Sequence, residues 1–380
     1  MKKSRQNSNK PISLKKTIIT SVFGDKIDEE LQRRLREDID YVGSFHYGKN
    51  QIKYNIKSKC GINFNDAKID SKKIAGFFQN RKNESLFYQY WIMDKTRPLV
   101  FFIHGNAENS TTHPFFLYNL LFQKYNLFVF DQIGYGDSDG IRGSLDNFND
   151  YIDNIDDFIN FARNSNNLCK NDIYLAGFST GALEVLYYYI FKDKKHSKEV
   201  YNNTKKIFLF SSFFKPHRKL INFPAEIFLI IFSRFFGKDR LIKQVKQKTI
   251  LESDEEFYIQ TYKNLTDNAD FLKRRKSDTR IYKVNSNRWI SRIILAQIRL
   301  FIRILFNRKS AAKDIKNLKV YFYVSENDFV VDNRQTLKIA RFLNLQNNVV
   351  ILKNSFHDFL DYEDERGANF YSDLNKKLQD

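Results

Sequence analysis

Six apolar runs, each long enough to form one β-strand, constrain the fold of this chain more than any other feature. They span residues 98–105, 126–134, 172–179, 206–212, 319–328 and 348–357. Stretches with helical periodicity separate the earlier runs, and the clearest of them covers residues 145–164. Continuous apolar strands that alternate with helices predict an α/β protein whose mostly parallel sheet is covered by helices on both faces.

The rest of the chain is organised around this sheet. Shorter strand-like pieces at residues 51–57, 73–78 and 85–93 precede the apolar runs and suggest a hairpin-like edge region. We divide the chain into a basic arm with a polar helix, a first part of the core, a mainly helical insertion after the sixth strand and a second part of the core. These segments are residues 1–45, 46–215, 216–314 and 315–380.

Composition and charge limit the possible partners and the expected cellular location. The formal net charge of +19 is compatible with an anionic partner, and equally with the drift in composition that AT-rich coding produces. Cys60 and Cys169 do not form a disulfide framework, and no Cys/His spacing resembles a zinc site. There is neither a secretory signal nor an apolar run long enough to span a membrane, so we expect a cytoplasmic protein, either free or peripheral at the inner membrane face.

The pentapeptide GFSTG, residues 177–181, follows an apolar run and precedes a helical one. It fits the G-x-S-x-G turn that holds a nucleophilic serine at the end of a strand. A plain structural turn is the alternative. Because the chain has only 14 glycines, two of them around Ser179 favour a position where the backbone requires glycine.

A serine nucleophile needs a base that is held by an acid. Of the six histidines, His357 alone follows a late strand, and the acids after the preceding strand are Asp328 and Asp332. Asp328 comes directly after that strand and is the preferred acid; Asp358 could orient the imidazole only from the adjacent position. The backbone N–H groups of Asn106 and Thr180 are the candidates for an oxyanion hole.

The motifs around these residues resemble those of the monoacylglycerol lipase and lysophospholipase (serine aminopeptidase-like) branch of the α/β-hydrolases. The matching motifs are HGNAE, DQIGYGDSDGIRG, GFSTG, SENDFVVD and SFHDFLDYED. The resemblance implies an α/β-hydrolase fold with a mostly parallel eight-stranded sheet and a helical cap inserted after the sixth strand. It also implies Ser179 as the nucleophile, Asp328 and His357 as its partners, and no cofactor or metal. Phe178, Ala182 and Ala107 depart from the family pattern, while Glu108 keeps its place as a brace of the loop.

The insertion carries much of the excess charge, with 22 Lys/Arg against 10 Asp/Glu in residues 216–314. It contains the apolar segment 221–236 and an amphipathic stretch at 288–309 with arginines along one side. This stretch is either a cap helix packed on the sheet or a helix that lies at an anionic membrane surface. Nucleic-acid binding is not expected, since no recognised module is present. The sequence does not specify the oligomeric state.

The resulting functional hypothesis is a serine hydrolase that cleaves a lysophospholipid or monoacylglycerol ester through an acyl-enzyme intermediate. Two alternatives stay open. One is a thioesterase, amidase or peptidase with the same triad. The other is a membrane-surface binding protein on a hydrolase scaffold.

Overall fold

The computed structural model describes residue 69 and residues 72–191, 198–217, 262–278, 280–281 and 285–380. The predicted basic arm and helix of residues 1–45, the strand at 51–57 and the apolar segment 221–236 lie outside this part of the chain. The six long apolar runs and the amphipathic stretch 288–309 lie within it.

The described residues form one eight-stranded sheet in the order β1-β2-β4-β3-β5-β6-β7-β8. The strands are β1 (Lys73–Gln79), β2 (Ser85–Trp91), β3 (Leu99–Ile103), β4 (Asn126–Phe130), β5 (Ile173–Phe178), β6 (Thr204–Phe210), β7 (Lys319–Ser325) and β8 (Val349–Leu352). Strand β2 runs antiparallel to both β1 and β4, and every other neighbouring pair is parallel. The predicted mostly parallel, eight-stranded sheet is confirmed.

Burial along the strands explains why the central runs are continuously apolar. Every residue of β3, β4 and β5 is buried, because helices cover both faces of the sheet there. The edge strand β1 is more open, and Ile74 and Phe77 are about half exposed, at 46% and 49%.

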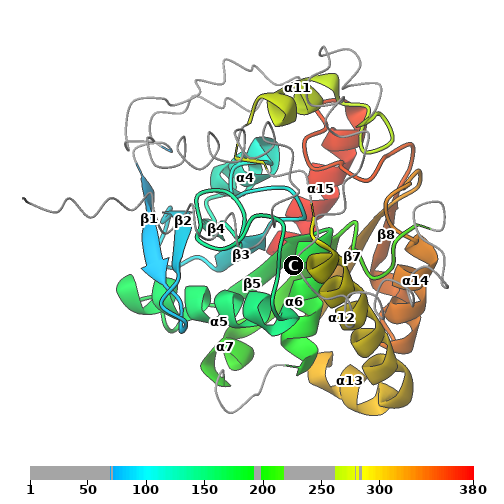
Figure 1. Ribbon diagram of the computed structural model, residues 1–380, viewed down its shortest axis with the longest axis horizontal. Coiled ribbons are helices and arrows are strands. Elements are labelled where there is room, and N and C mark those ends of the chain that lie inside the picture. Colours follow the sequence, from blue (N-terminus) through cyan, green and yellow to red (C-terminus); the bar gives the residue numbers. More distant parts are fainter. Residues whose placement is uncertain (1–68, 70–71, 192–197, 218–261, 279, 282–284) are drawn as a thin grey trace, which may run out of the picture.

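Helices form a layer on each side of the sheet (Figure 1). Helices α5, α6, α12, α13 and α14 contribute to one hydrophobic cluster with the sheet, and α4 and α15 contribute to the other. Their bounds are α4 (Pro114–Phe122), α5 (Phe148–Ser165), α6 (Thr180–Phe191), α12 (Asn287–Phe306), α13 (Arg308–Ile315), α14 (Asn333–Phe342) and α15 (Glu365–Gln379). The shorter elements are α7 (Lys198–Asn203), α11 (Ala269–Ser277) and the 3₁₀ turn η1 (Gln346–Asn348).

The amphipathic helix α12 packs as a member of this flanking layer. Its buried apolar side chains belong to the same cluster as the sheet, and include Trp289, Ile293, Leu300 and Ile304. Its arginines are engaged by the protein: Arg288 pairs with the Asp146 carboxylate, and Arg292 donates to the Asp146 carbonyl at 2.8 Å. Packing in the cluster with the sheet therefore accounts for the buried apolar face of α12. The amphipathic pattern in the sequence identifies such a face but does not say what it packs against.

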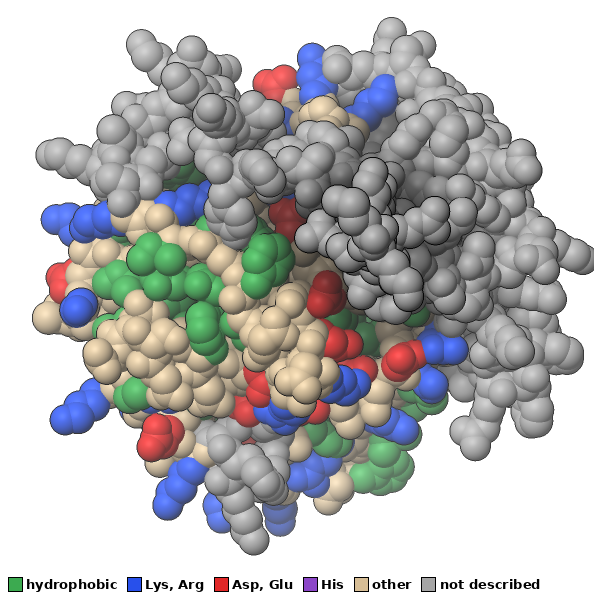
Figure 2. Space-filling model, turned by 60° about the vertical axis from the view of Figure 1, so that its left-hand side comes forward, with side chains coloured by type: hydrophobic (Ala, Val, Ile, Leu, Met, Phe, Trp, Pro, Cys, Tyr) green, Lys and Arg blue, Asp and Glu red, His purple; other side chains and the backbone are tan. Residues whose placement is uncertain are grey.

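Basic side chains do not gather in one patch on the face shown in Figure 2, where they are spread round the margins of the described surface. Nearer the middle of this face, acidic side chains lie beside further basic side chains. Within the described ranges, no helix combines the length and apolar character needed to cross a bilayer.

Candidate active site

The serine of GFSTG lies at a sharp turn between strand β5, which ends at Phe178, and helix α6, which begins at Thr180. Ser179 has φ = 53°, in the left-handed region that L-residues seldom adopt. The flanking glycines are required by close backbone contacts: a Cβ on Gly181 would lie 2.2 Å from the Ile103 carbonyl oxygen, and one on Gly177 would lie 2.4 Å from the Gly181 carbonyl oxygen. The turn therefore fixes Ser179 at the carboxyl end of the sheet.

The structure brings Ser179, His357 and Asp328 into one line of hydrogen bonds. His357 Nε2 lies 3.1 Å from Ser179 Oγ, and His357 Nδ1 lies 2.8 Å from Asp328 Oδ2. The other oxygen of Asp328 accepts hydrogen bonds from the N–H groups of Val330 and Val331, which fix the carboxylate. With its hydrogen on Nδ1, the imidazole donates to Asp328 and accepts the Ser179 hydroxyl proton on Nε2.

The two other acids that the sequence offered lie elsewhere. Asp332 caps helix α14 by accepting from Arg334 N–H and pairs with the Arg334 guanidinium at 2.7 Å. Asp358 faces His113, whose Nδ1 is 3.7 Å away.

Electrostatics favour a basic imidazole at His357. Burial by itself would lower the pKa of His357, but the carboxylates of Asp328, Asp358 and Glu108, with Asp328 the largest contributor, together raise it above its ordinary value. The side chains of all three residues are almost fully buried, so their interactions are little screened by solvent. Such a group can take a proton from Ser179 and stabilise the resulting positive charge.

The loop after β3 is held close to Ser179. Ala107 adopts φ = 55°, a left-handed conformation that suits the glycine of the family pattern better than alanine. Glu108 Oε2 accepts the Gly105 N–H at 2.7 Å, and Tyr135 donates its hydroxyl hydrogen to Asn106 Oδ1 at 2.8 Å. Glu108 thus braces the loop, and Tyr135 is a supporting residue that sequence reasoning missed.

The second oxyanion candidate is placed by helix α6. Thr180 is the first residue of this helix, and the N–H groups of a first helical turn have no acceptor within the helix. Its N–H is therefore available beside Ser179, in a position where the helix dipole favours negative charge.

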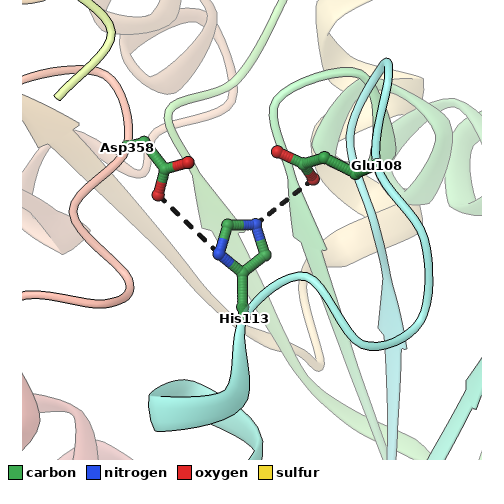
Figure 3. A group of neighbouring side chains, drawn as sticks. All are labelled: Glu108, His113 and Asp358. Carbon is green, nitrogen blue, oxygen red and sulfur yellow. Dashed lines mark ion pairs between the residues drawn. The ribbon is translucent and has the colours of Figure 1, made fainter. Parts of the chain in front are cut away.

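A buried group of charged side chains connects this loop to the segment that carries His357. Figure 3 shows the ring of His113 between Glu108 and Asp358. His113 Nδ1 lies 2.9 Å from Asp361 Oδ2, and His113 Nε2 lies 3.2 Å from Glu108 Oε2 in an ion-pair contact without hydrogen-bond geometry. Arg275 adds a second cation, with Nη1 3.6 Å from Glu108 Oε1.

The charge states within this group follow from the contacts. Although burial opposes charge, Glu108 and Asp358 raise the pKa of His113 well above its ordinary value. The same pairing holds the pKa of Glu108 down at about 2, whereas burial raises the pKa of Asp358 to about 7. The ligand atoms of Glu108, His113 and Asp358 lie close enough together to surround a metal ion. The nearby Arg275 guanidinium and the position of the His113 ring between carboxylates favour a protonated imidazole in place of a metal ion.

Replacing His113 tests this charge assignment. We expect His113→Gln to lower the free energy of unfolding by about 3 kcal/mol at pH 6, because buried carboxylates lose their cation. The raised pKa of His113 makes this contribution complete below the unfolded-state pKa of about 6.5, and it is lost as the pH rises through the folded-state value. Denaturant unfolding at pH 6 and pH 9 measures the difference.

Asp358→Asn is the matched control for His113→Gln. Both Asp358 carboxylate oxygens are buried and accept no hydrogen bond from the part of the chain that the structure describes, so the variant should be at least as stable as the wild type at pH 9. A cost for His113→Gln that is the same at both pH values would contradict an imidazolium.

Sequence signals for this group were weak. His113 stands in a loop outside any motif, and its partner Asp361 is 248 positions away. The acids in SFHDFLDYED were the one available hint, since several acids in a segment that returns to a buried site need cations.

Comparison with known proteins agrees with the fold. A family model described as serine aminopeptidase, S33, matches residues 94–365. No curated protein sequence gives a significant match.

Among solved structures, a soluble variant of monoglyceride lipase from Saccharomyces cerevisiae is similar at 17% identity and a TM-score of 0.64, over 80% of this chain and 94% of the other. The monoacylglycerol lipase of Paleococcus ferrophilus is similar at 17% identity and a TM-score of 0.57, over 77% and 98%. An esterase from Exiguobacterium antarcticum is 12% identical, with a TM-score of 0.54 over 81% of this chain and 100% of the other. At these identities the likeness shows a common fold.

Proposed function

We propose that this chain, which belongs to the serine aminopeptidase S33 family of α/β-hydrolases, is a serine hydrolase that cleaves carboxylic esters of single-chain lipids. The observation that carries the proposal is the hydrogen-bonded line from Ser179 through His357 to Asp328, with distances of 3.1 and 2.8 Å. Nucleophile, base and orienting acid are the three parts that acyl transfer by serine requires.

The chemistry follows from these positions. Ser179 Oγ attacks the ester carbonyl carbon while His357 Nε2 takes the hydroxyl proton, and Asp328 stabilises the imidazolium that forms. The carbonyl oxygen becomes an oxyanion, which the N–H groups of Asn106 and Thr180 bind. His357 then returns its proton to the leaving alcohol, which leaves an acyl group on Ser179.

Water completes the cycle by the same route. His357 takes a proton from water, the hydroxide attacks the acyl carbon, and the fatty acid leaves as the proton returns to Ser179. Each half of the reaction uses the same base and the same oxyanion donors, so one site serves for both.

Three observations support a lysophospholipid or monoacylglycerol as the substrate. The motifs around the triad resemble those of the lipase and lysophospholipase branch, the insertion contains the apolar segment 221–236, and two structurally similar proteins are described as monoglyceride or monoacylglycerol lipases. An acyl chain needs apolar side chains to bind against, and the segment 221–236 is rich in large apolar residues.

Labelling with a fluorophosphonate probe tests the nucleophile. We expect covalent modification of the native protein at Ser179, located by peptide mapping, and none after heat denaturation. Because the reagent needs an activated serine, failure of a folded sample to react would contradict the proposed hydrolase. Modification of a different serine would contradict the assignment of Ser179.

A substrate panel then separates the alternatives. Faster release of fatty acid from monooleoylglycerol or lysophosphatidylcholine than from short soluble esters supports a lipid substrate. Preference for an acyl thioester, an amide or a peptide would indicate the corresponding hydrolase. Binding to anionic vesicles without labelling or turnover would indicate a membrane-surface binding protein.

A further inference from the structure

A cavity of about 70 Å³ lies between the loop that precedes α4 and the helix α11. One wall includes Thr111, Thr112 and Pro114, and the other includes Phe271, Arg274 and Arg275. One water molecule needs roughly 10–15 Å³ of such volume, so the cavity has room for a group of several heavy atoms. No step of the proposed reaction uses it.

Arg274 is held in place by aromatic rings and has an unused donor. Its guanidinium carbon lies 5.6 Å from the ring centre of Phe115 and 6.0 Å from that of Phe271. Its Nη2 is buried and has no hydrogen-bond partner among the described residues. Cation–π contacts therefore fix the guanidinium without satisfying its hydrogens.

Arg275 presents a second unused donor to the same cavity. Its side chain is only 9% exposed, and its Nη1 lies 3.6 Å from Glu108 Oε1, an ion-pair contact that is too long for a hydrogen bond. Buried N–H groups are almost always hydrogen-bonded in proteins. Two arginines that line one cavity and have unused hydrogens indicate that an acceptor binds there.

The acids nearest the cavity are already engaged by other groups. Asp278, at its margin, receives hydrogen bonds from Arg280 Nε at 3.0 Å and Arg280 Nη2 at 2.9 Å. Glu108 accepts the Gly105 N–H and pairs with His113. The charge left for a ligand is therefore positive, and it comes from arginine, whose forked donors suit phosphate oxygens.

We propose that this cavity binds a phosphate group. A tetrahedral phosphate offers several acceptor oxygens, so it can accept from Arg274 and Arg275 at once and offset the repulsion between them. The group comes either from free phosphate or from the headgroup of a lysophospholipid, and the second source rests on the proposed function. Thr111 and Thr112 in the wall of the cavity belong to the same loop between β3 and α4 as Asn106, so the cavity and the candidate active site share this loop.

Calorimetric titration of the full chain with inorganic phosphate, glycerol 3-phosphate and glycerol tests the proposal. We expect saturable binding of at least one of the two phosphates and none of glycerol. Arg274→Gln should weaken that binding about tenfold or more, because a charge-assisted hydrogen bond is lost. Arg274→Lys keeps the charge without the fork and should bind with intermediate affinity.

Lys273→Gln is the matched control, since it removes one positive charge from an exposed residue of the same helix that lies outside the cavity lining. It should change phosphate affinity by less than about twofold, because exposed charges are well screened. Absence of saturable phosphate binding by the wild type would overturn the proposal. Equal binding by the wild type and a folded Arg274→Gln variant would also overturn it.

Kinetics separate the two sources of the phosphate group. If it is a headgroup, Arg274→Gln should raise KM for 1-oleoyl lysophosphatidate about tenfold and leave KM for monooleoylglycerol unchanged. If it is free phosphate, calorimetry should still show binding that depends on Arg274, and neither KM should change. The titration needs no turnover, so a failure of the proposed hydrolase activity would be seen separately, by the absence of fluorophosphonate labelling.

Discussion

Ser179→Ala is expected to lower kcat for the best lipid ester by about 10⁶-fold, the size of effect seen when a triad nucleophile is removed. Its Oγ is the atom that forms the acyl bond, so the lost interaction exists only in the reaction and not in substrate binding. KM and thermal stability should change little, because alanine accepts the left-handed backbone here as Ala107 does at φ = 55°. Fatty-acid release and thermal unfolding measure the two effects.

Ser211→Ala provides the matched control for Ser179→Ala. Ser211 is also buried and also has a positive φ, of 42°, but its hydroxyl donates to the His357 carbonyl oxygen at 2.6 Å instead of facing His357 Nε2. Its loss should cost this hydrogen bond and the one between Ser211 Oγ and Ser325 Oγ at 3.3 Å, with a fall in kcat of at most about tenfold. Comparable turnover by wild type and Ser179→Ala would remove Ser179 as the nucleophile.

Much of the fold was predictable because the central strands are apolar on both faces. Runs such as 98–105 and 172–179 are typical of strands buried between two helical layers, and their order with the intervening helices restricts the sheet to few topologies. The meeting of Ser179 with His357 follows from the same rule, since the carboxyl ends of parallel strands meet at one edge.

What could not be predicted depends on contacts between distant side chains. The periodicity of α12 identifies an apolar face but not its neighbour, and the structure places Trp289 and Ile293 in the cluster that faces the sheet. No local sequence pattern around His113 or Arg275 indicates that both side chains contact Glu108. Such contacts depend on three-dimensional packing, which a one-dimensional pattern leaves open.

Asp328→Asn is expected to lower kcat by about 10⁴-fold, the loss that follows when the base of such a triad is held in the wrong tautomer. An asparagine amide can still accept from the Val330 N–H, but its NH₂ group would face His357 Nδ1, which then could not donate. The imidazole would carry its hydrogen on Nε2 and could not take the proton of Ser179. Stopped or continuous assays of fatty-acid release measure the loss.

The two candidate acids are discriminated by Asp332→Asn, which should keep kcat within about twofold of wild type because asparagine is an equally good N-cap for α14. The pH profile adds an independent test. Asp328 raises the pKa of His357, so in Asp328→Asn the acid limb of kcat/KM should move to lower pH, while Asp332→Asn should leave it in place. A large loss of kcat in Asp332→Asn, together with nearly normal kcat in Asp328→Asn, would show that Asp332 orients His357. That result would contradict the role inferred from the 2.8 Å contact between His357 and Asp328.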